Sequence, residues 1–254
     1  MKELDALTRE LDQWAEAGKT AEFWWRDDDA EEPTDAIRRL LDQASEADVP
    51  LILATIPKGA GDALAQLVEQ HPVIVPVQHG WAHQDHAPQA LKGKWELGYH
   101  RPMPAILDQL TDGRTKLETL FGDRFQPMMV PPWNRIDPAV INRLAGIGLT
   151  ALSTSDARPG PTAAPGLAQV NCHCDIIKWK NVRAFVGPEK MAIKLVNHLI
   201  ARRTGEADSV EPTGLLTHAW IHDNAAWQAL AAVARLINDH PAACWVNPMD
   251  NITQ

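Results

Sequence analysis

The stretch Phe23-Trp24-Trp25-Arg26-Asp27-Asp28-Asp29 places three carboxylates directly after a run of large apolar residues. The run predicts a short buried strand, residues 23–26, that ends on the acidic cluster. Three adjacent carboxylates repel one another, so the folded chain needs a cation to neutralise them. The other interpretation is a solvated turn in which an aspartate caps a helix. The rest of the sequence decides between the two.

Outward from this stretch, four more polar clusters lie at the ends of apolar segments. They are His79-Gly80-Trp81-Ala82-His83, Val130-Pro131-Pro132-Trp133-Asn134, residues 175–179, and Leu216-Thr217-His218. One carboxylate and two histidines form a candidate metal triad, and a spare carboxylate and a spare histidine supply a base and an acid. The pattern predicts a metal-assisted hydrolase.

Strand and helix signals alternate along the whole chain. Helices are predicted over 4–14, 33–47, 62–70, 104–121, 138–145, 190–203 and 225–238, and strands over 23–26, 51–56, 73–77, 128–130, 148–152, 214–218 and 243–246. Residues 158–167 are predicted to form a loop, and residues 170–177 an irregular β segment. This order predicts an α/β fold, a distorted (β/α) barrel of about seven strands with its chemistry at the C-terminal strand ends.

Composition excludes several classes of protein. Hydrophobic residues at 45% and charged residues at 22% are ordinary for a globular protein. The net charge of −9 argues against a nucleic-acid partner. No apolar run reaches the ~20 residues that span a bilayer. Residues 1–20 read as a charged amphipathic helix without the apolar centre of a signal peptide, so the sequence predicts a cytoplasmic protein. With no linker in view, we expect one domain over 1–254 with this helix packed on it.

The two histidines of the second cluster are four residues apart. That spacing puts both rings on one face if the segment is helical, which suits zinc or another borderline divalent metal. The pair His83 and His86 is an alternative. The double proline after residue 130 stiffens the chain and can hold the Trp133 N–H toward a reacting carbonyl.

Ten tryptophans and three cysteines are the other unusual counts. Tryptophan beside a site can stack on a sugar face or simply fill the core. Cys172 and Cys174 flank His173, which is compatible with a soft-metal site, but small buried hydrophobes in a reduced compartment are the favoured interpretation. Alternate residues of a strand point to one face, so the two cysteines are expected to share a surface.

Taken in order, the five clusters resemble the motifs of the polysaccharide deacetylase family, the NodB-like carbohydrate esterases, from Phe23 to Trp220. The resemblance implies a distorted (β/α) barrel and one divalent metal, with zinc first and cobalt, iron or nickel as alternatives. It also implies hydrolysis of an N-acetyl group on a small carbohydrate, glycan or other sugar-containing substrate.

The first family motif supplies a base and then a metal ligand before a small residue. With Ala30 as that small residue, Asp28 is the base and Asp29 the ligand. The other register makes Asp27 the base and Asp28 the ligand. The resemblance also makes His79 and His83 the remaining metal ligands.

The third motif departs from the family, because Val130 stands where an arginine normally orients the base. Arg26 or Arg135 are candidate substitutes. Pro132 and Trp133 match the substrate-binding part of this motif.

The last two motifs supply the acid and the acyl pocket. Asp175, Trp179 and Lys180 match the fourth motif, with Lys178 where a second aspartate is common. Leu216 and His218 match the fifth. The resemblance implies that His218 is the general acid, held by Asp175, and that Trp179 and Leu216 wall the acyl pocket.

Two rival functions stay open. The missing motif arginine is compatible with a sugar-binding protein of this fold that has no turnover. A metal-dependent hydrolase of a non-sugar amide or ester is the other rival. The sequence does not give the oligomeric state.

Overall fold

The computed structural model describes residues 2–250 and 252. Its helices are α1 (Asp5–Glu16), α2 (Asp35–Glu46), α3 (Asp62–Glu69), α4 (Met103–Phe121), α5 (Pro138–Leu144), α6 (Pro188–Thr204) and α7 (Asn224–Asp239). Its strands are β1 (Ala21–Ala30), β2 (Leu51–Thr55), β3 (Ile74–His79), β4 (Met128–Val130), β5 (Ala151–Leu152), β6 (Thr162–Ala164), β7 (Leu167–Gln169), β8 (Cys174–Asp175), β9 (Ile177–Lys178), β10 (Ala184–Phe185), β11 (Thr213–Thr217) and β12 (Ala243–Trp245).

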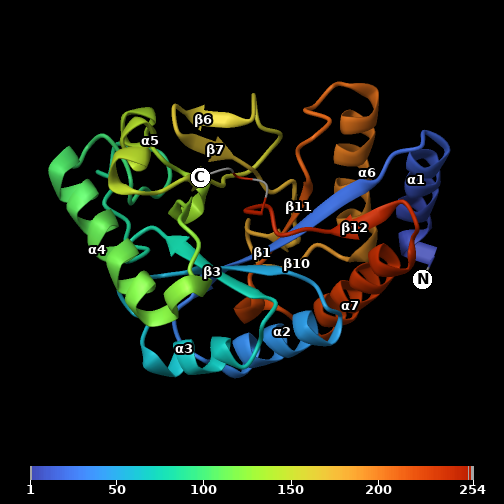
Figure 1. The fold of residues 1–254 in the computed structure, drawn as a ribbon, viewed down its shortest axis with the longest axis horizontal. Helices are drawn as coiled ribbons and strands as arrows, with labels where there is room; N and C mark the ends of the chain where they lie inside the picture. Colours follow the sequence, from blue (N-terminus) through green and yellow to red (C-terminus); the bar gives the residue numbers. More distant parts are fainter. Residues whose placement is uncertain (1, 251, 253–254) are drawn as a thin grey trace.

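The strands form one main sheet surrounded by the helices (Figure 1). Strands β8, β11, β1, β2, β3, β4 and β5 lie side by side in that order, and all of them are parallel. The strand β12 pairs with the start of β1, β6 pairs antiparallel with β7, and β9 and β10 form a separate hairpin. Helical crossovers between parallel neighbours produce this order.

The segment 167–175 joins the two ends of the sheet. Ala168 pairs with Ala151 on β5, and Cys174 pairs with Leu215 on β11. Between these pairings, the N–H groups of Asp156 and Cys172 donate hydrogen bonds of 3.0 Å to Cys172 and Thr154 across the seam. The sheet therefore curls into a distorted barrel, and the predicted fold class is confirmed.

Strand β1 shows how the sequence divides its side chains between the two faces. Phe23 and Trp25 belong to the apolar cluster beneath the helices, whereas Trp24 lies in the barrel interior with Ile52 and Leu216. This alternation is the two-residue period of a strand. The helix α1 packs on α6.

Several expected elements differ in detail. Strand β1 runs through the acidic cluster to Ala30 instead of ending before it. The predicted loop 158–167 contains β6. Cys172 lies in the barrel interior and Cys174 under the helices, because the chain between β7 and β8 is not a regular strand. All three cysteines are free thiols. Within the described residues, no helix combines the length and apolarity required to cross a bilayer.

Candidate active site

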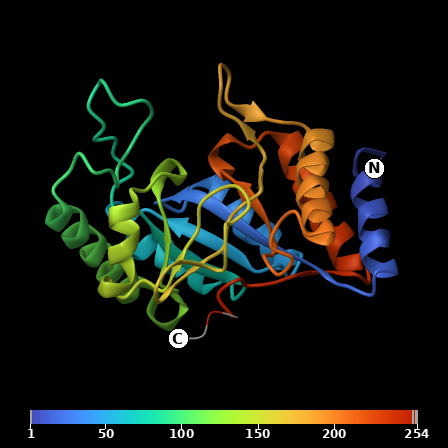
Figure 2. The ribbon, with the colours of Figure 1, turned by 90° about the horizontal axis from the view of Figure 1, so that it is seen from above.

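A cleft of about 1080 Å³ opens at the C-terminal ends of the parallel strands. Apart from Pro132, the predicted site residues all line it, namely Asp28, Asp29, His79, His83, Trp133, Asp175, Trp179, Leu216 and His218. Figure 2 shows two segments that rise on the same side of the molecule, the loop between β3 and α4 and the β9–β10 hairpin. Residues from both segments line the cleft.

Asp29, His79 and His83 form a compact group of potential metal ligands. The Oδ1 atom of Asp29 lies 3.2 Å from Nε2 of each histidine. Asp29 has φ of 75°, and the pairing register of β1 shifts between Asp27 and Ala30. A bulge of this kind re-aims a side chain, and it explains how Asp29 reaches the histidines. His86 is not part of this group, so the alternative ligand pair is not supported.

The tautomer of His79 suits a metal ligand. Its Nδ1 lies 2.9 Å from the carbonyl oxygen of Val130, which can only accept a hydrogen bond. Nδ1 therefore carries a proton, and Nε2 is the ring nitrogen that faces Asp29 and that a metal would bind in its unprotonated form. Two imidazole nitrogens and one carboxylate oxygen are a donor set that zinc and similar divalent metals accept. The residues present fit such a cation.

The ionisable side chains of this group shift one another's pKa values. Burial raises the pKa of Asp29, but the hydrogen bond and charge of His79 outweigh it, so this pKa lies below its usual range. Burial lowers the pKa of His83 to about 4, and repulsion from His79 adds to the shift. His83 is therefore neutral near pH 7, the form that binds metals.

The segment that carries His83 is a turn rather than the helix considered from the sequence. Glu96, which is fully buried, accepts hydrogen bonds from the N–H groups of Trp81 and Ala82 at 3.2 and 2.8 Å. Gly80 has φ of 57°, and a Cβ atom there would lie 2.1 Å from Glu96 Oε2. The turn thus requires glycine, and Glu96 fixes it so that the two rings converge.

The three adjacent carboxylates have separate surroundings. Asp27 points to the helix-covered side, where its Oδ2 accepts hydrogen bonds from Thr217 Oγ1 at 2.6 Å and from the Ala219 N–H at 2.9 Å. Burial raises its pKa well above the usual range. Asp28 points to the barrel interior, on the same face as Arg26, as the strand period requires.

Arg26 is the partner of Asp28. The two side chains form an ion pair with 2.8 Å between Nε and Oδ1, and Nη2 donates a hydrogen bond to Oδ2 at 3.0 Å. The guanidinium also donates to Ser153 Oγ and to Asn134 Oδ1, both at 2.7 Å. Burial lowers the pKa of Arg26, but the Asp28 charge outweighs it and raises that pKa overall. The other candidate substitute, Arg135, donates to the Lys94 carbonyl instead.

The expected hydrogen bond between His218 and Asp175 does not form. Asp175 accepts instead from Trp179 Nε1 at 2.6 Å and from the Ile177 N–H at 2.8 Å. The Trp179 ring packs edge-on against His218, with 4.6 Å between centroids. Within residues 2–250 and 252, the buried Nδ1 of His218 has no hydrogen-bond partner. Leu216 is buried below it in the barrel interior.

The double-proline turn places Trp133 against the group of potential metal ligands. The Trp133 ring lies 4.4 Å from the His83 ring, between centroids. Trp133 and Asn134 have φ of 56° and 54°, a strained conformation for residues with a side chain. Pro132 is buried at the start of this turn rather than lining the cleft.

Sequence reasoning missed four residues that support the site: Glu96, Asn134, Ser153 and Trp220. The Nε1 atom of Trp220 donates to Asp29 Oδ2 at 3.0 Å. Asn134 is the last residue of a quoted cluster and Trp220 lies two residues after another, which was an available signal. Glu96 and Ser153 gave none, because their contacts depend on the folded arrangement of loops.

A second cluster of potential ligands lies toward the other ends of the strands. Here Glu211 is fully buried, and its carboxylate accepts hydrogen bonds from the N–H groups of Asn171 at 2.9 Å and Arg158 at 3.0 Å. His173 Nε2 lies 3.3 Å from it, and His198 stacks on His173 with 3.3 Å between centroids.

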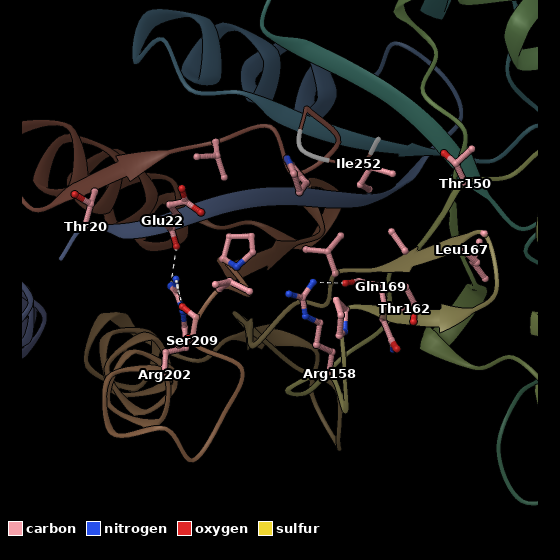
Figure 3. A pocket seen from close by; sticks show the side chains of 18 residues that line it. Thr20, Glu22, Thr150, Arg158, Thr162, Leu167, Gln169, Arg202, Ser209 and Ile252 are labelled. Carbon is pink, nitrogen blue, oxygen red and sulfur yellow. Dashed lines mark hydrogen bonds between the residues drawn. The ribbon is translucent and has the colours of Figure 1, made fainter. Parts of the chain in front are cut away.

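This second cluster does not fit a cation. The Gly214 N–H donates to His173 Nδ1 at 2.9 Å, so the ring proton sits on Nε2 and no lone pair faces Glu211. A cavity of about 740 Å³ opens nearby, and Figure 3 shows its arginines bonded to carbonyl oxygens. Arg158 donates to Gln169 and Arg202 to Glu22, at 2.6 and 3.0 Å. The arrangement is that of a structural hydrogen-bond network.

No family model matches the chain, and no curated protein matches its sequence. Several solved structures do match its fold. A Mycobacterium smegmatis protein assigned as a polysaccharide deacetylase has a TM-score of 0.63 and 18% identity, covering 92% of this chain and 89% of its own.

Two further structures give similar values. A family 4 acetyl xylan esterase from Clostridium thermocellum, solved with a cobalt ion, has a TM-score of 0.55 and 13% identity, covering 90% of this chain and 89% of its own. A carbohydrate esterase family 4 pseudoenzyme from Bacillus anthracis has a TM-score of 0.56 and 13% identity, covering 92% of this chain and 66% of its own. The chain therefore has the fold of the polysaccharide deacetylases and family 4 carbohydrate esterases.

Proposed function

We propose that this protein is a metal-dependent deacetylase that removes an N-acetyl group from a carbohydrate or sugar-containing substrate. The observation that carries the proposal is the convergence of Asp29, His79 and His83 within 3.2 Å contacts of one carboxylate oxygen in a cleft. A divalent metal bound by these three residues supplies Lewis-acid chemistry, making water more acidic and the acyl carbonyl more electrophilic. Zinc is our first choice, with cobalt, iron or nickel as alternatives.

Asp28 is the proposed general base. It takes a proton from the attacking water as the water oxygen bonds to the carbonyl carbon. Its ion pair with Arg26 holds the carboxylate in one orientation. The alternative base, Asp27, points away from the cleft and is bonded to Thr217 and Ala219.

His218 is the proposed general acid. It lies at the end of β11 and lines the cleft, and its proton goes to the departing amine as the carbon–nitrogen bond breaks. Asp175 acts on it through Trp179, whose ring it fixes by a 2.6 Å hydrogen bond. The products are acetate and a free amino sugar.

The positions of three residues in the cleft suggest how the substrate is bound. Trp179 and Leu216 are the proposed sides of the acyl pocket, which favours acetyl over longer chains. The Trp133 N–H, on the strained turn after Pro132, is a proposed donor to the oxyanion that develops on the carbonyl oxygen.

Removing the metal and removing its ligand test the proposal together. We expect a chelator or His79→Ala to abolish acetate release from N-acetylated chito-oligosaccharides, and added zinc or cobalt to restore only the chelated wild type. His86→Ala is the matched control, because His86 lies outside the ligand group. Undiminished acetate release from the chelator-treated wild type or from His79→Ala contradicts the metal mechanism.

The leading rival is a sugar-binding protein without turnover, and a pseudoenzyme of similar fold exists in Bacillus anthracis. The motif arginine is absent in our chain, but Arg26 occupies the equivalent chemical role. Sugar binding without acetate release at saturating metal favours the rival. Faster turnover of simple aryl esters than of acetylated sugars favours a non-sugar hydrolase. The cytoplasmic location and the domain limits 1–254 stay predictions.

A further inference from the structure

The catalytic groups are flanked by two cations that stand on tryptophan rings. On one wall, the Arg183 guanidinium lies 5.9 Å from the centroid of Trp179 and 5.6 Å from that of Trp220. On another, Lys94 Nζ lies 5.6 Å from the centroid of Trp133. Both cations line the cleft. These distances are within the range of cation–π attraction.

The tryptophans tie Arg183 to the reacting centre. Trp220 donates to Asp29, a proposed metal ligand, and Trp179 donates to Asp175 and packs on His218. The guanidinium of Arg183 therefore lies against two indoles that are themselves held by the proposed acid and metal-ligand residues.

Neither cation forms an ion pair with another described residue. Across residues 2–250 and 252, no carboxylate lies within 4.0 Å of Arg183 or Lys94. Of the six carboxylates on the cleft wall, Asp28, Asp29 and Asp175 contact other groups of the site, and Asp85 accepts hydrogen bonds from the N–H groups of Ala87 and Trp95 at 3.0 Å. The other two, Glu31 and Glu32, form no ion pair either.

The segment 177–187 carries a net positive charge, whereas the chain as a whole is negative. The whole protein carries −9, yet residues 177–187 contain Lys178, Lys180 and Arg183 and no acidic residue. This segment is the β9–β10 hairpin, which projects from the body of the molecule in Figure 2. Of these three cations only Arg183 lines the cleft, and a cation at that position attracts an anionic group of a ligand.

We propose that the cleft takes an N-acetylated sugar that carries a phosphate group, bound by Arg183, with Lys94 adding attraction from its own wall. The inference rests on the proposed deacetylase function and names its substrate class. A phosphate ester carries a charge near −2 at neutral pH. The guanidinium presents several donors in a planar fork that matches phosphate oxygens, and its indole supports leave those donors free.

The test compares acetate release from N-acetylglucosamine with release from its 1-phosphate and 6-phosphate. We expect the wild type to favour a phosphorylated sugar at least tenfold in kcat/KM. Arg183→Gln should bring this ratio close to one, and Arg183→Lys should restore part of it. Because it is a ratio, it does not depend on the fraction of folded enzyme.

The same hairpin supplies the matched control. Lys180→Gln removes the same charge from a residue that does not line the cleft, and the wild-type ratio should be kept within twofold. For Lys94→Gln, the control is Lys92→Gln, which is also outside the cleft wall. A wild-type kcat/KM ratio of one or less overturns the phosphate subsite. Equal decreases of this ratio in Arg183→Gln and Lys180→Gln also overturn it. Both outcomes leave the deacetylase proposal standing.

Binding of the reaction product separates the two proposals. Calorimetry with glucosamine 6-phosphate and with glucosamine needs no turnover. Should no acetylated sugar be hydrolysed, weaker phosphate-sugar binding in Arg183→Gln than in Lys180→Gln still supports the subsite, whereas equal binding in both overturns it.

A free sugar phosphate and a lipid-linked one share the chemistry that Arg183 recognises. N-acetylglucosamine 1-phosphate, free or esterified to a short prenyl chain in detergent, distinguishes the two sources. Arg183-dependent turnover of either form supports the subsite and identifies its source. Turnover of both without dependence on Arg183 overturns it.

Discussion

At the scale of single residues, the acidic triplet divides three identical side chains among three tasks. Strand period sends Asp27 to the helix-covered face and Asp28 to the interior face of Arg26, and a bulge turns Asp29 toward the histidines. Chemical type alone cannot distinguish them. Their roles follow from which face of β1 each one occupies.

The first prediction distinguishes Asp27 from Asp28, two aspartates whose side chains lie on opposite faces of β1. Asp27→Asn should fold and keep most of the deacetylase activity, because the amide oxygen can still accept from Thr217 and Ala219. Asp28→Asn should lower kcat by about a thousandfold or more, since an amide is no base. Steady-state acetate release and thermal unfolding of both variants provide the check. A well-folded, inactive Asp27→Asn protein contradicts the register.

A second prediction concerns the displaced arginine. Arg26→Lys keeps the charge but cannot hold both oxygens of Asp28. We expect kcat to fall about 10- to 100-fold with a smaller change in KM, because orientation of a base acts in the reaction step. Arg38→Lys, on the exposed surface of α2, is the control. An unchanged kcat in Arg26→Lys means that the pair does not orient the base.

At the scale of elements, the turn after β3 decides whether two ligands meet. It is not a helix, and its shape depends on Gly80 and on the buried carboxylate of Glu96. Residues that orient metal ligands through hydrogen bonds commonly change metal affinity when altered.

The third prediction follows from that turn. Glu96→Gln replaces one acceptor oxygen by an amino group that faces an N–H, so the turn loosens. Zinc affinity should fall about tenfold or more, while the thermal unfolding temperature changes less than for Gly80→Ala, whose Cβ would lie 2.1 Å from Glu96 Oε2. Competition with a chromogenic chelator measures the affinity, and Glu46→Gln on α2 serves as control. Equal zinc affinity in wild type and Glu96→Gln contradicts this role.

Elements with a strong period were predictable, and those defined by contacts were not. The amphipathic helices and the buried parallel strands follow from apolar spacing, as with α4 and β2. The strand β6 was missed because a region rich in proline, glycine and alanine gives a loop signal, and pairing with β7 overrides it.

The same division holds for the candidate site. Nine of the ten proposed site residues line one cleft, because parallel strands deliver their C-terminal residues to one edge. The predicted hydrogen bond between His218 and Asp175 was wrong, because the Asp175 carboxylate accepts a hydrogen bond from Trp179 Nε1 instead. Side-chain competition of this kind has no sequence signature.

At the scale of the whole molecule, the barrel is joined by a segment that relies on a buried polar network. Glu211, His173 and His198 connect α6 and the start of β11 to the segment 167–175. Burial lowers the pKa of His198 to about 2, and the charges of His173 and Arg202 add to the shift.

The fourth prediction is a pH dependence of stability. In the unfolded chain, histidine titrates near 6.5, so between pH 6.5 and 2 the unfolded state binds a proton that the folded state does not. Stability therefore falls as the pH decreases through this window, by about 1 kcal/mol at pH 5.5 from this residue. Urea unfolding at pH 7.5 and 5.5 measures it. His198→Asn should reduce the difference between the free energies of unfolding at the two pH values, whatever the stability of the variant at either one. An unchanged difference contradicts the assignment.

The β9–β10 hairpin pairs only with itself and contributes no strand to the barrel. Apart from Trp179, which contacts Asp175 and His218, the hairpin tip at residues 180–183 is therefore free to vary without disturbing the closure of the sheet. Such separation allows natural variation or laboratory selection to exchange the recognised leaving group by replacing a single surface loop, while the hydrolytic machinery is inherited intact.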